Sequence, residues 1–73
     1  MRITIKLFGH FKDGRFETED WDLSEGTQVL QVLKLLRIEP IETMIFINGH
    51  FGSINDSLCN GDVLSILPPI AGG

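Results

Sequence analysis

Apolar and polar residues alternate singly at the start of the chain. Ile3, Ile5 and Leu7 follow one another from Arg2 onward with one polar residue between each pair. A period of two that is rich in β-branched residues is typical of a strand with one buried face. We therefore predict a strand over residues 2–7 whose three apolar side chains point inward.

The next segment is predicted to turn back on this strand. Residues 9–14 begin and end with glycine and form a turn-prone stretch, and residues 15–23 then return as an antiparallel strand. The apolar positions of the returning strand are out of phase with a period of two: Phe16, Trp21 and Leu23. This mismatch predicts a bulge or bend near Glu19 and Asp20.

The hydrophobic period then becomes that of a helix. Thr27 is the predicted N-cap, because its hydroxyl can accept a hydrogen bond from a free amide of the first turn. Pro40 disfavours helical backbone at Glu39, so the helix should end near Arg37. Apolar residues at helical spacing form one stripe: Val29, Val32, Leu33 and Leu36, widened by Leu30 and Leu35. Such a stripe predicts a helix packed on a sheet.

Two more strands are predicted after the helix, over residues 43–48 and 63–67, each next to an Asn-Gly turn signal. Ile45 and Ile47 are the predicted inner positions of the first of them. The order strand, strand, helix, strand, strand predicts an α+β fold of the β-grasp type. In this fold a mixed sheet of four to five strands carries one main helix on one face.

The opposite face of this sheet is predicted to be apolar as well. Strand parity places four residues there: Met44, Phe46, Val63 and Leu67. Because a contiguous apolar patch on a monomer commonly marks an interaction site, we predict a partner-binding surface. The alternative is that a loop side chain, Phe51 or Phe11, folds over the patch and covers it.

Length and composition restrict the possible functions. The 73 residues leave room for one domain, predicted over residues 1–67, with a C-terminal tail over residues 68–73. The net charge of -4, with scattered basic residues, argues against nucleic-acid binding. The chain contains no apolar run long enough to cross a bilayer and no signal-peptide pattern. We therefore expect a cytoplasmic protein with no membrane partner.

The side chains offer little conventional chemistry. Cys59 is the only cysteine, which excludes an intramolecular disulfide and a cysteine-based zinc cluster. No pattern places it near His10 or His50, and we interpret all three as incidental. The acidic residues between 17 and 22 lack calcium-loop spacing and are interpreted as a solvated strand face. Residues 9–14 lack the lysine and hydroxyl pair of a phosphate loop. We predict no metal site and no bound cofactor.

The C-terminal end is more distinctive. Two prolines stiffen the exit from the last strand, and the residues after them have little side-chain bulk. Because glycine has no Cβ, a Gly-Gly terminus can pass through a narrow channel in a partner. The segment predicted to thread such a channel comprises Pro68, Pro69, Ile70, Ala71 and Gly72, which precede Gly73.

Several stretches together resemble the ubiquitin-like sulfur carriers. They are Leu7-Phe8-Gly9, Thr27-Gln28-Val29, Ile47-Asn48-Gly49, Asn60-Gly61-Asp62 and the ending Leu67-Pro68-Pro69-Ile70-Ala71-Gly72-Gly73. The ending is more similar to the small subunit of molybdopterin synthase than to the thiamine-thiazole sulfur carrier. The chain departs from typical members in its shorter second strand and helix. Lys6 and Ser65 also depart, because they stand on the outer sheet face where apolar residues are expected.

The resemblance implies a carrier and not an enzyme, with Gly73 as the reactive residue. A C-terminal carboxylate is ionised at neutral pH and is a poor electrophile. The resemblance therefore implies a partner adenylyltransferase, similar to ubiquitin-activating enzymes, that uses ATP to form an acyl-adenylate on Gly73. A persulfide or sulfide donor would displace AMP and leave a thiocarboxylate. The large subunit of molybdopterin synthase would use this sulfur on a pterin precursor.

Three alternatives stay open at this point. The first is a sulfur carrier for thiamine thiazole or another sulfur metabolite, and the second is a ubiquitin-like protein modifier joined to lysines through Gly73. The third is an interaction module whose tail has no chemical role.

Overall fold

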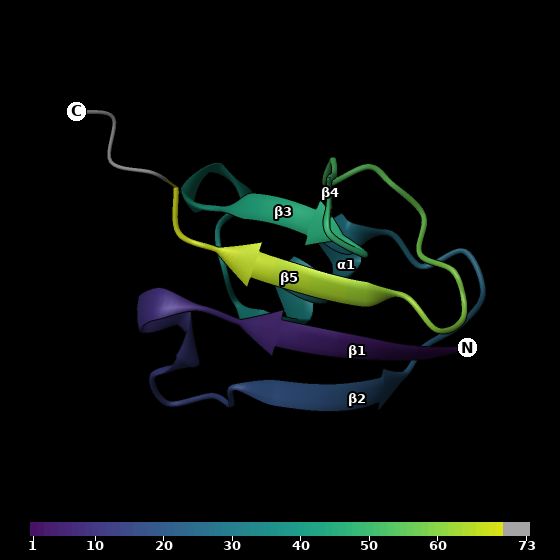
Figure 1. Ribbon diagram of the computed structural model, residues 1–73, viewed down its shortest axis with the longest axis horizontal. Helices are drawn as coiled ribbons and strands as arrows, with labels where there is room; N and C mark the ends of the chain where they lie inside the picture. The colour runs from purple at the N-terminus through teal and green to yellow at the C-terminus, as the bar shows by residue number, and fades with distance from the viewer. Residues whose placement is uncertain (70–73) are drawn as a thin grey trace.

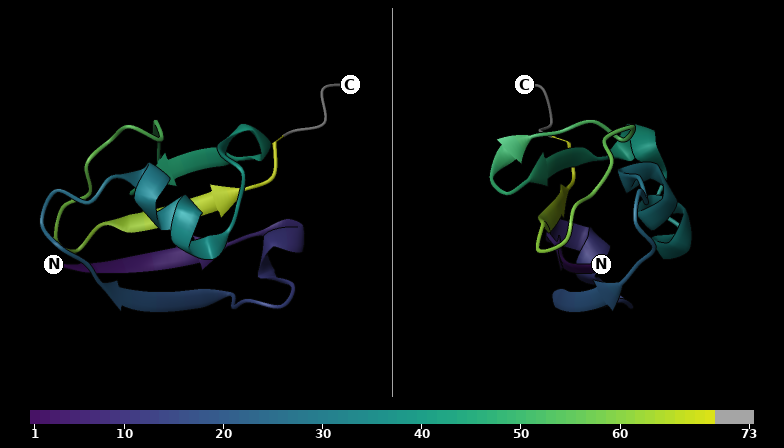
Figure 2. Two further views of the ribbon diagram at one scale, coloured as in Figure 1. Left: turned by 180° about the vertical axis from the view of Figure 1, so that it is seen from behind. Right: turned by 90° about the vertical axis from the view of Figure 1, so that its right-hand side faces the viewer.

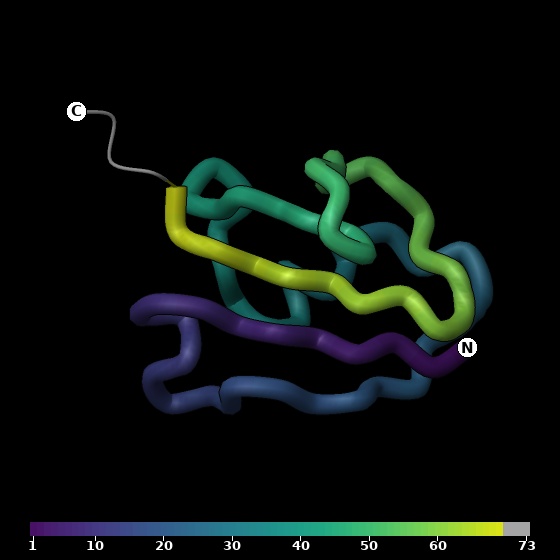
Figure 3. The backbone as a smooth tube through the Cα atoms, viewed as in Figure 1, coloured from purple at the N-terminus to yellow at the C-terminus, as the bar shows by residue number. Residues whose placement is uncertain are grey.

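The structure is a computed structural model that describes residues 1–69. One five-stranded sheet has the order β2-β1-β5-β3-β4 (Figure 1). Its strands are β1 (Arg2–Leu7), β2 (Thr18–Asp22), β3 (Met44–Ile47), β4 (His50–Phe51) and β5 (Val63–Leu67). The two terminal strands lie side by side at the centre and run in the same direction (Figure 3). All other pairs are antiparallel, so the sheet is mixed and the predicted β-grasp fold is confirmed.

Helix α1 (Val29–Leu36) lies across one face of this sheet (Figure 2). The predicted stripe of the helix is buried, and so are the predicted inward residues of β1. The core that they form consists of Ile3, Ile5, Leu7, Phe11, Val29, Val32, Leu33, Leu36, Ile38, Ile45, Leu58, Leu64 and Ile66. Ile47 is half-buried and packs against this core, and Leu30 is half-buried on α1. The prediction for Leu35 is wrong: it is 66% exposed, because it lies on the solvent side of the stripe.

The start of the helix differs from the prediction. Gln28, and not Thr27, is the N-cap, and Gln28 and Gln31 form a reciprocal capping box in which the Gln28 amide donates to Oε1 of Gln31 at 2.9 Å. The Thr27 hydroxyl instead donates to the carbonyl of Ser24 at 2.7 Å. Backbone pairing of Gln28 with Ser57 keeps the chain extended up to the cap. The helix ends as predicted, with Arg37 as its C-cap.

The N-terminal hairpin is shorter and more regular than predicted. Strand β2 begins at Thr18, and its register with β1 is unbroken from Lys6–Thr18 to Arg2–Asp22, so the predicted bulge is absent. Phe16 precedes the strand, which is why its phase differs. Its ring still lies 6.1 Å from that of Trp21, measured between centroids.

Two short 3-10 helices complete the fold. The turn-prone stretch after β1 contains η1 (Gly9–Lys12), and η2 (Pro40–Glu42) connects α1 to β3. Strand β3 is shorter by one residue at each end than the predicted strand. The two-residue strand β4 lies outside the predicted strands.

Candidate functional site

The face of the sheet opposite α1, called here the outer face, carries the residues predicted to bind a partner. Met44, Phe46, Val63 and Leu67 alternate along β3 and β5 with the buried residues Ile45, Leu64 and Ile66. All four are half-buried. Strand parity therefore places them as predicted, and their role in binding stays a prediction.

Cross-strand pairing brings apolar side chains of β3 next to those of β4 and β5, while Val63 pairs with Thr4 of β1. Met44 is the register partner of Leu67, and Phe46 is the partner of Phe51 in β4. The rings of the two phenylalanines meet edge to face with centroids 5.6 Å apart. Such a pair adds about 0.5–1.5 kcal/mol beyond its burial.

Two further phenylalanines decide whether the patch is covered. Phe51 contacts Phe46 but is itself 73% exposed, so it extends the apolar surface and does not bury it. Phe11 is 2% exposed within the core. The predicted alternative, a loop side chain that covers the patch, is therefore wrong for both residues.

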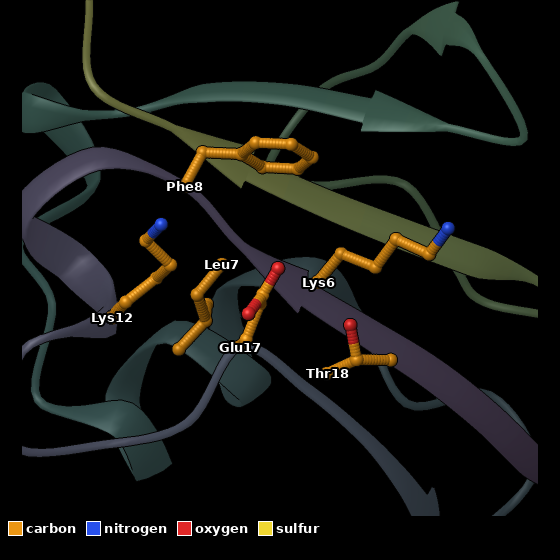
Figure 4. Close-up of a pocket in the computed structure, with 6 residues that line it drawn as sticks. All are labelled: Lys6, Leu7, Phe8, Lys12, Glu17 and Thr18. Carbon is orange, nitrogen blue, oxygen red and sulfur yellow. The ribbon is translucent and has the colours of Figure 1, made fainter.

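Phe8 is a part of this surface that the sequence analysis missed. It follows β1 in phase with Lys6, and its amide donates to the Ile66 carbonyl of β5 at 3.1 Å. Figure 4 shows Phe8 and Lys6 on one side of β1 and Leu7 on the other. The alternation of β1, continued by one residue, is the signal that could have identified it. The apolar patch then comprises Phe8, Met44, Phe46, Phe51, Val63 and Leu67.

The other half of the outer face is polar. Ser65 pairs with both Phe46 and Lys6, and so it stands between the apolar patch and the charged strands, as predicted. Beyond it, Arg2 approaches Asp20 and Asp22 with N–O distances of 3.9 Å each. The Thr4 hydroxyl donates to Asp20 at 2.7 Å. The acidic strand face is thus solvated and paired with neighbouring side chains.

A small cavity lies where the two halves meet, beside Phe8. Its volume is about 200 Å³. Figure 4 draws the residues that line it: Lys6, Leu7, Phe8, Lys12, Glu17 and Thr18. Among residues 1–69 the ion pairs are the two made by Arg2, so both lysines can meet charges on a partner.

The predicted tail is described only at its beginning. Pro68 is half-buried and Pro69 is exposed, directly after β5 ends at Leu67. Ile70, Ala71, Gly72 and Gly73, which is predicted to be the reactive residue, lie outside the described residues, and their roles stay predictions. The apolar patch and the tail are adjacent in the chain, because Leu67 belongs to the patch and Pro68 follows it.

The remaining candidates are exposed side chains. His10, His50 and Cys59 all face solvent. Within the described part of the chain, no three metal-ligating side chains gather at one place. The same residues include no helix with the length and apolar character needed to span a bilayer.

Comparison with known proteins adds a family match. The model of the ThiS family matches residues 5–73 of the chain. No curated protein matches it.

Solved structures share the fold over nearly the whole chain. A protein assigned as molybdopterin converting factor subunit 1 from Pyrococcus furiosus is 22% identical with a TM-score of 0.79, and the match covers 96% of this chain and 99% of that one. Small archaeal modifier protein 1 from Haloferax volcanii is 18% identical with a TM-score of 0.77, covering 94% and 98%. A chain in the complex of subunits 1 and 2 of the molybdopterin-converting factor from Helicobacter pylori is 27% identical with a TM-score of 0.69, covering 100% of both.

Proposed function

The chain belongs to the ThiS family of ubiquitin-like sulfur carriers, and we propose that it carries sulfur as a thiocarboxylate on Gly73 for molybdopterin synthesis. The observation that carries the proposal is the uncovered apolar patch, which includes Leu67 at the end of the strand that leads into the Pro-Pro-Ile-Ala-Gly-Gly ending. A carrier needs a surface for docking and a reactive end that leaves from the edge of that surface. The family match over residues 5–73 supports both requirements.

The proposed reaction must first activate the Gly73 carboxylate, because an ionised carboxylate is a poor electrophile. An adenylating partner would join the Gly73 carboxylate to the AMP moiety of ATP and release pyrophosphate, so that AMP becomes the leaving group. Attack by sulfide then expels AMP and gives the thiocarboxylate directly. Attack by a persulfide gives an acyl disulfide. A thiol then attacks the donor's sulfur in this disulfide, which releases the thiocarboxylate and leaves a disulfide between the thiol and the donor. In both routes the carrier supplies the acyl group, and the catalytic groups belong to its partners.

The proposed synthase partner is a large subunit that docks on the apolar patch and receives the tail. A few well-packed residues near the centre of an interface contribute most of its binding energy. The apolar patch reaches the tail at Leu67, which directly precedes Pro68, and Lys6 and Lys12 lie at its rim beside Phe8. The Helicobacter pylori structure, in which subunits 1 and 2 of the molybdopterin-converting factor form a complex, supports this kind of partner.

Mass spectrometry of the intact protein tests the proposal. After coexpression with the adenylating enzyme and a sulfur donor, the full chain should carry one sulfur in place of one oxygen, with the corresponding gain in mass. A variant that lacks Gly73 should gain nothing. An unchanged mass for the full chain under conditions that consume ATP would overturn the proposal.

Three further observations separate the alternatives. A protein modifier would appear in higher-mass conjugates that survive boiling in reductant. A carrier for thiamine thiazole would restore thiamine synthesis, and not molybdenum-cofactor synthesis, in cells that lack their own carrier. An interaction module would bind its partner equally well with or without Gly73.

A further inference from the structure

The turn after β1 touches the base of the C-terminal tail. Gly9 opens η1 with a φ of +60°, and a Cβ built on it would lie 2.7 Å from Cγ and 3.2 Å from Cδ of Pro68. The neighbouring hydrogen bond from the Phe8 amide to the Ile66 carbonyl, 3.1 Å long, holds the two segments together. Pro68 therefore packs against backbone at a position where any other residue would place a side chain.

The Pro68 ring cannot rotate away from such a side chain. Its Cγ and Cδ belong to a ring closed on the backbone nitrogen, and that ring fixes φ at about −65°. A carbon–carbon approach of 2.7 Å is far inside the favourable separation of about 3.5–4.0 Å. A Cβ on Gly9 must therefore be accommodated by movement of the backbone around Pro68, which is where the tail leaves the sheet.

The geometry points to Gly9 as a positioning residue for the carrier tail. By leaving room for the Pro68 ring, it sets the direction in which the chain continues from β5 beside the apolar patch. This inference rests on the proposed function, since it assigns Gly9 a part in presenting Gly73 to the adenylating partner. Gly9 does not touch the reacting atoms and acts through Pro68.

Gly14 provides a matched control in the same loop. Its φ of +71° imposes the same kind of backbone strain on an alanine, but a Cβ there would meet no atom within 4 Å. Gly9→Ala and Gly14→Ala thus share the cost of a left-handed backbone and differ in the contact with Pro68.

The structural part of the test uses nuclear Overhauser contacts in the full chain. Wild type and Gly14→Ala should show contacts between the α protons of residue 9 and the ring protons of Pro68. In Gly9→Ala this contact should be lost, and the resonances of Leu67 and Pro69 should shift. If Gly9→Ala keeps the Leu67 and Pro69 resonances of wild type, the tail has not moved and the inference fails.

The functional part measures thiocarboxylate formation by the adenylating enzyme. Gly9→Ala should lower kcat by about 10- to 100-fold with little change in KM, because small misplacements of a reacting group cost rate while the docking surface is intact. Gly14→Ala should keep the wild-type kcat. In a Pro68→Ala background, Gly9→Ala should change kcat by much less, because the proline ring that would clash with the Cβ of residue 9 is absent.

The outcomes separate the two proposals. Equal losses of kcat in Gly9→Ala and Gly14→Ala would assign the effect to backbone strain and overturn the positioning role. If wild type itself gains no sulfur, the carrier function fails. The contact and resonance changes then decide by themselves whether Gly9 directs the segment that begins at Pro68.

Discussion

The two faces of the sheet are built from alternate residues of the same strands, and they differ in what covers them. On β5, Leu64 and Ile66 are completely buried under α1. Leu67, on the same strand, faces the other way and is only half-buried. Among residues 1–69, no helix or strand lies over that face (Figure 2).

Hydrophobicity alone does not distinguish these two surfaces. Both faces of β3 and β5 are rich in apolar side chains, as the nearly continuous run Met44–Ile47 illustrates. Burial separates them: the inner face stabilises the fold, whereas the outer face is available for association. The comparison therefore assigns stability to the inner set of side chains, and partner binding by the outer set stays a proposal.

The largest expected effect compares two leucines of β5. Leu64→Ala should lower the free energy of unfolding by about 2–5 kcal/mol, since it leaves a cavity in the core. Leu67→Ala should lower it by about 1 kcal/mol, because this side chain keeps much of its exposure in the folded state. Urea unfolding measures both values. Equal losses would show that the outer face also acts as core.

Local periodicity was sufficient to predict most of the inner face. The single alternation of Ile3, Ile5 and Leu7 and the helical stripe from Val29 to Leu36 gave the strand, the helix and their buried sides correctly, except for Leu35. The cap of the helix was not predictable in this way. It depends on the pairing of Gln28 with Ser57, two residues that are distant in sequence.

The outer face was predictable only in part. Parity placed Met44, Phe46, Val63 and Leu67 correctly, because β3 and β5, with four and five residues, are long enough to show the alternation. Phe51 was missed as a member of the patch because β4 has two residues, too few to show a period. Gly9 and Pro68 are far apart in the sequence, so no local pattern predicts that they lie close together.

The second prediction tests the outer face as a docking surface. Leu67→Glu, or Phe46→Glu farther from the tail, should weaken binding to the synthase partner by at least about 2 kcal/mol, because each buries a charge at the centre of the proposed interface. Both variants should stay folded, since neither position is in the core. Titration calorimetry measures the affinity.

Leu35→Glu is the matched control. Leu35 is 66% exposed on α1, on the opposite side of the molecule from the patch, and it should tolerate the same charge with unchanged affinity. Equal weakening by Leu35→Glu and Leu67→Glu would assign the effect to net charge and remove the distinction between the two faces.

A third prediction concerns the rim of the covered face. Arg15 donates from Nε to the Leu36 carbonyl at 3.0 Å and from Nη1 to the Phe11 carbonyl at 3.1 Å, so it joins the end of α1 to the turn after β1. Arg15→Ala should cost about 1–2 kcal/mol, since it removes two charge-assisted hydrogen bonds and a cation at a helix C-terminus. Arg15→Lys should recover part of the lost stability, because lysine keeps the positive charge but lacks the planar guanidinium that donates both hydrogen bonds. Full recovery by lysine would show that charge alone is responsible.

The smallest effect is expected from the corresponding arginine of the outer face. The Arg2 side chain is 65% exposed, and its nitrogens approach Asp20 and Asp22 only to 3.9 Å, without hydrogen bonds between the side chains. Arg2→Ala should therefore change the free energy of unfolding by less than about 0.5 kcal/mol. Added salt should reduce even this difference, whereas the loss of stability caused by Arg15→Ala should change little with salt. A larger loss for Arg2→Ala than for Arg15→Ala would mean that ion pairs stabilise the charged half of the outer face, and stability could then no longer be assigned to the covered side of the sheet alone.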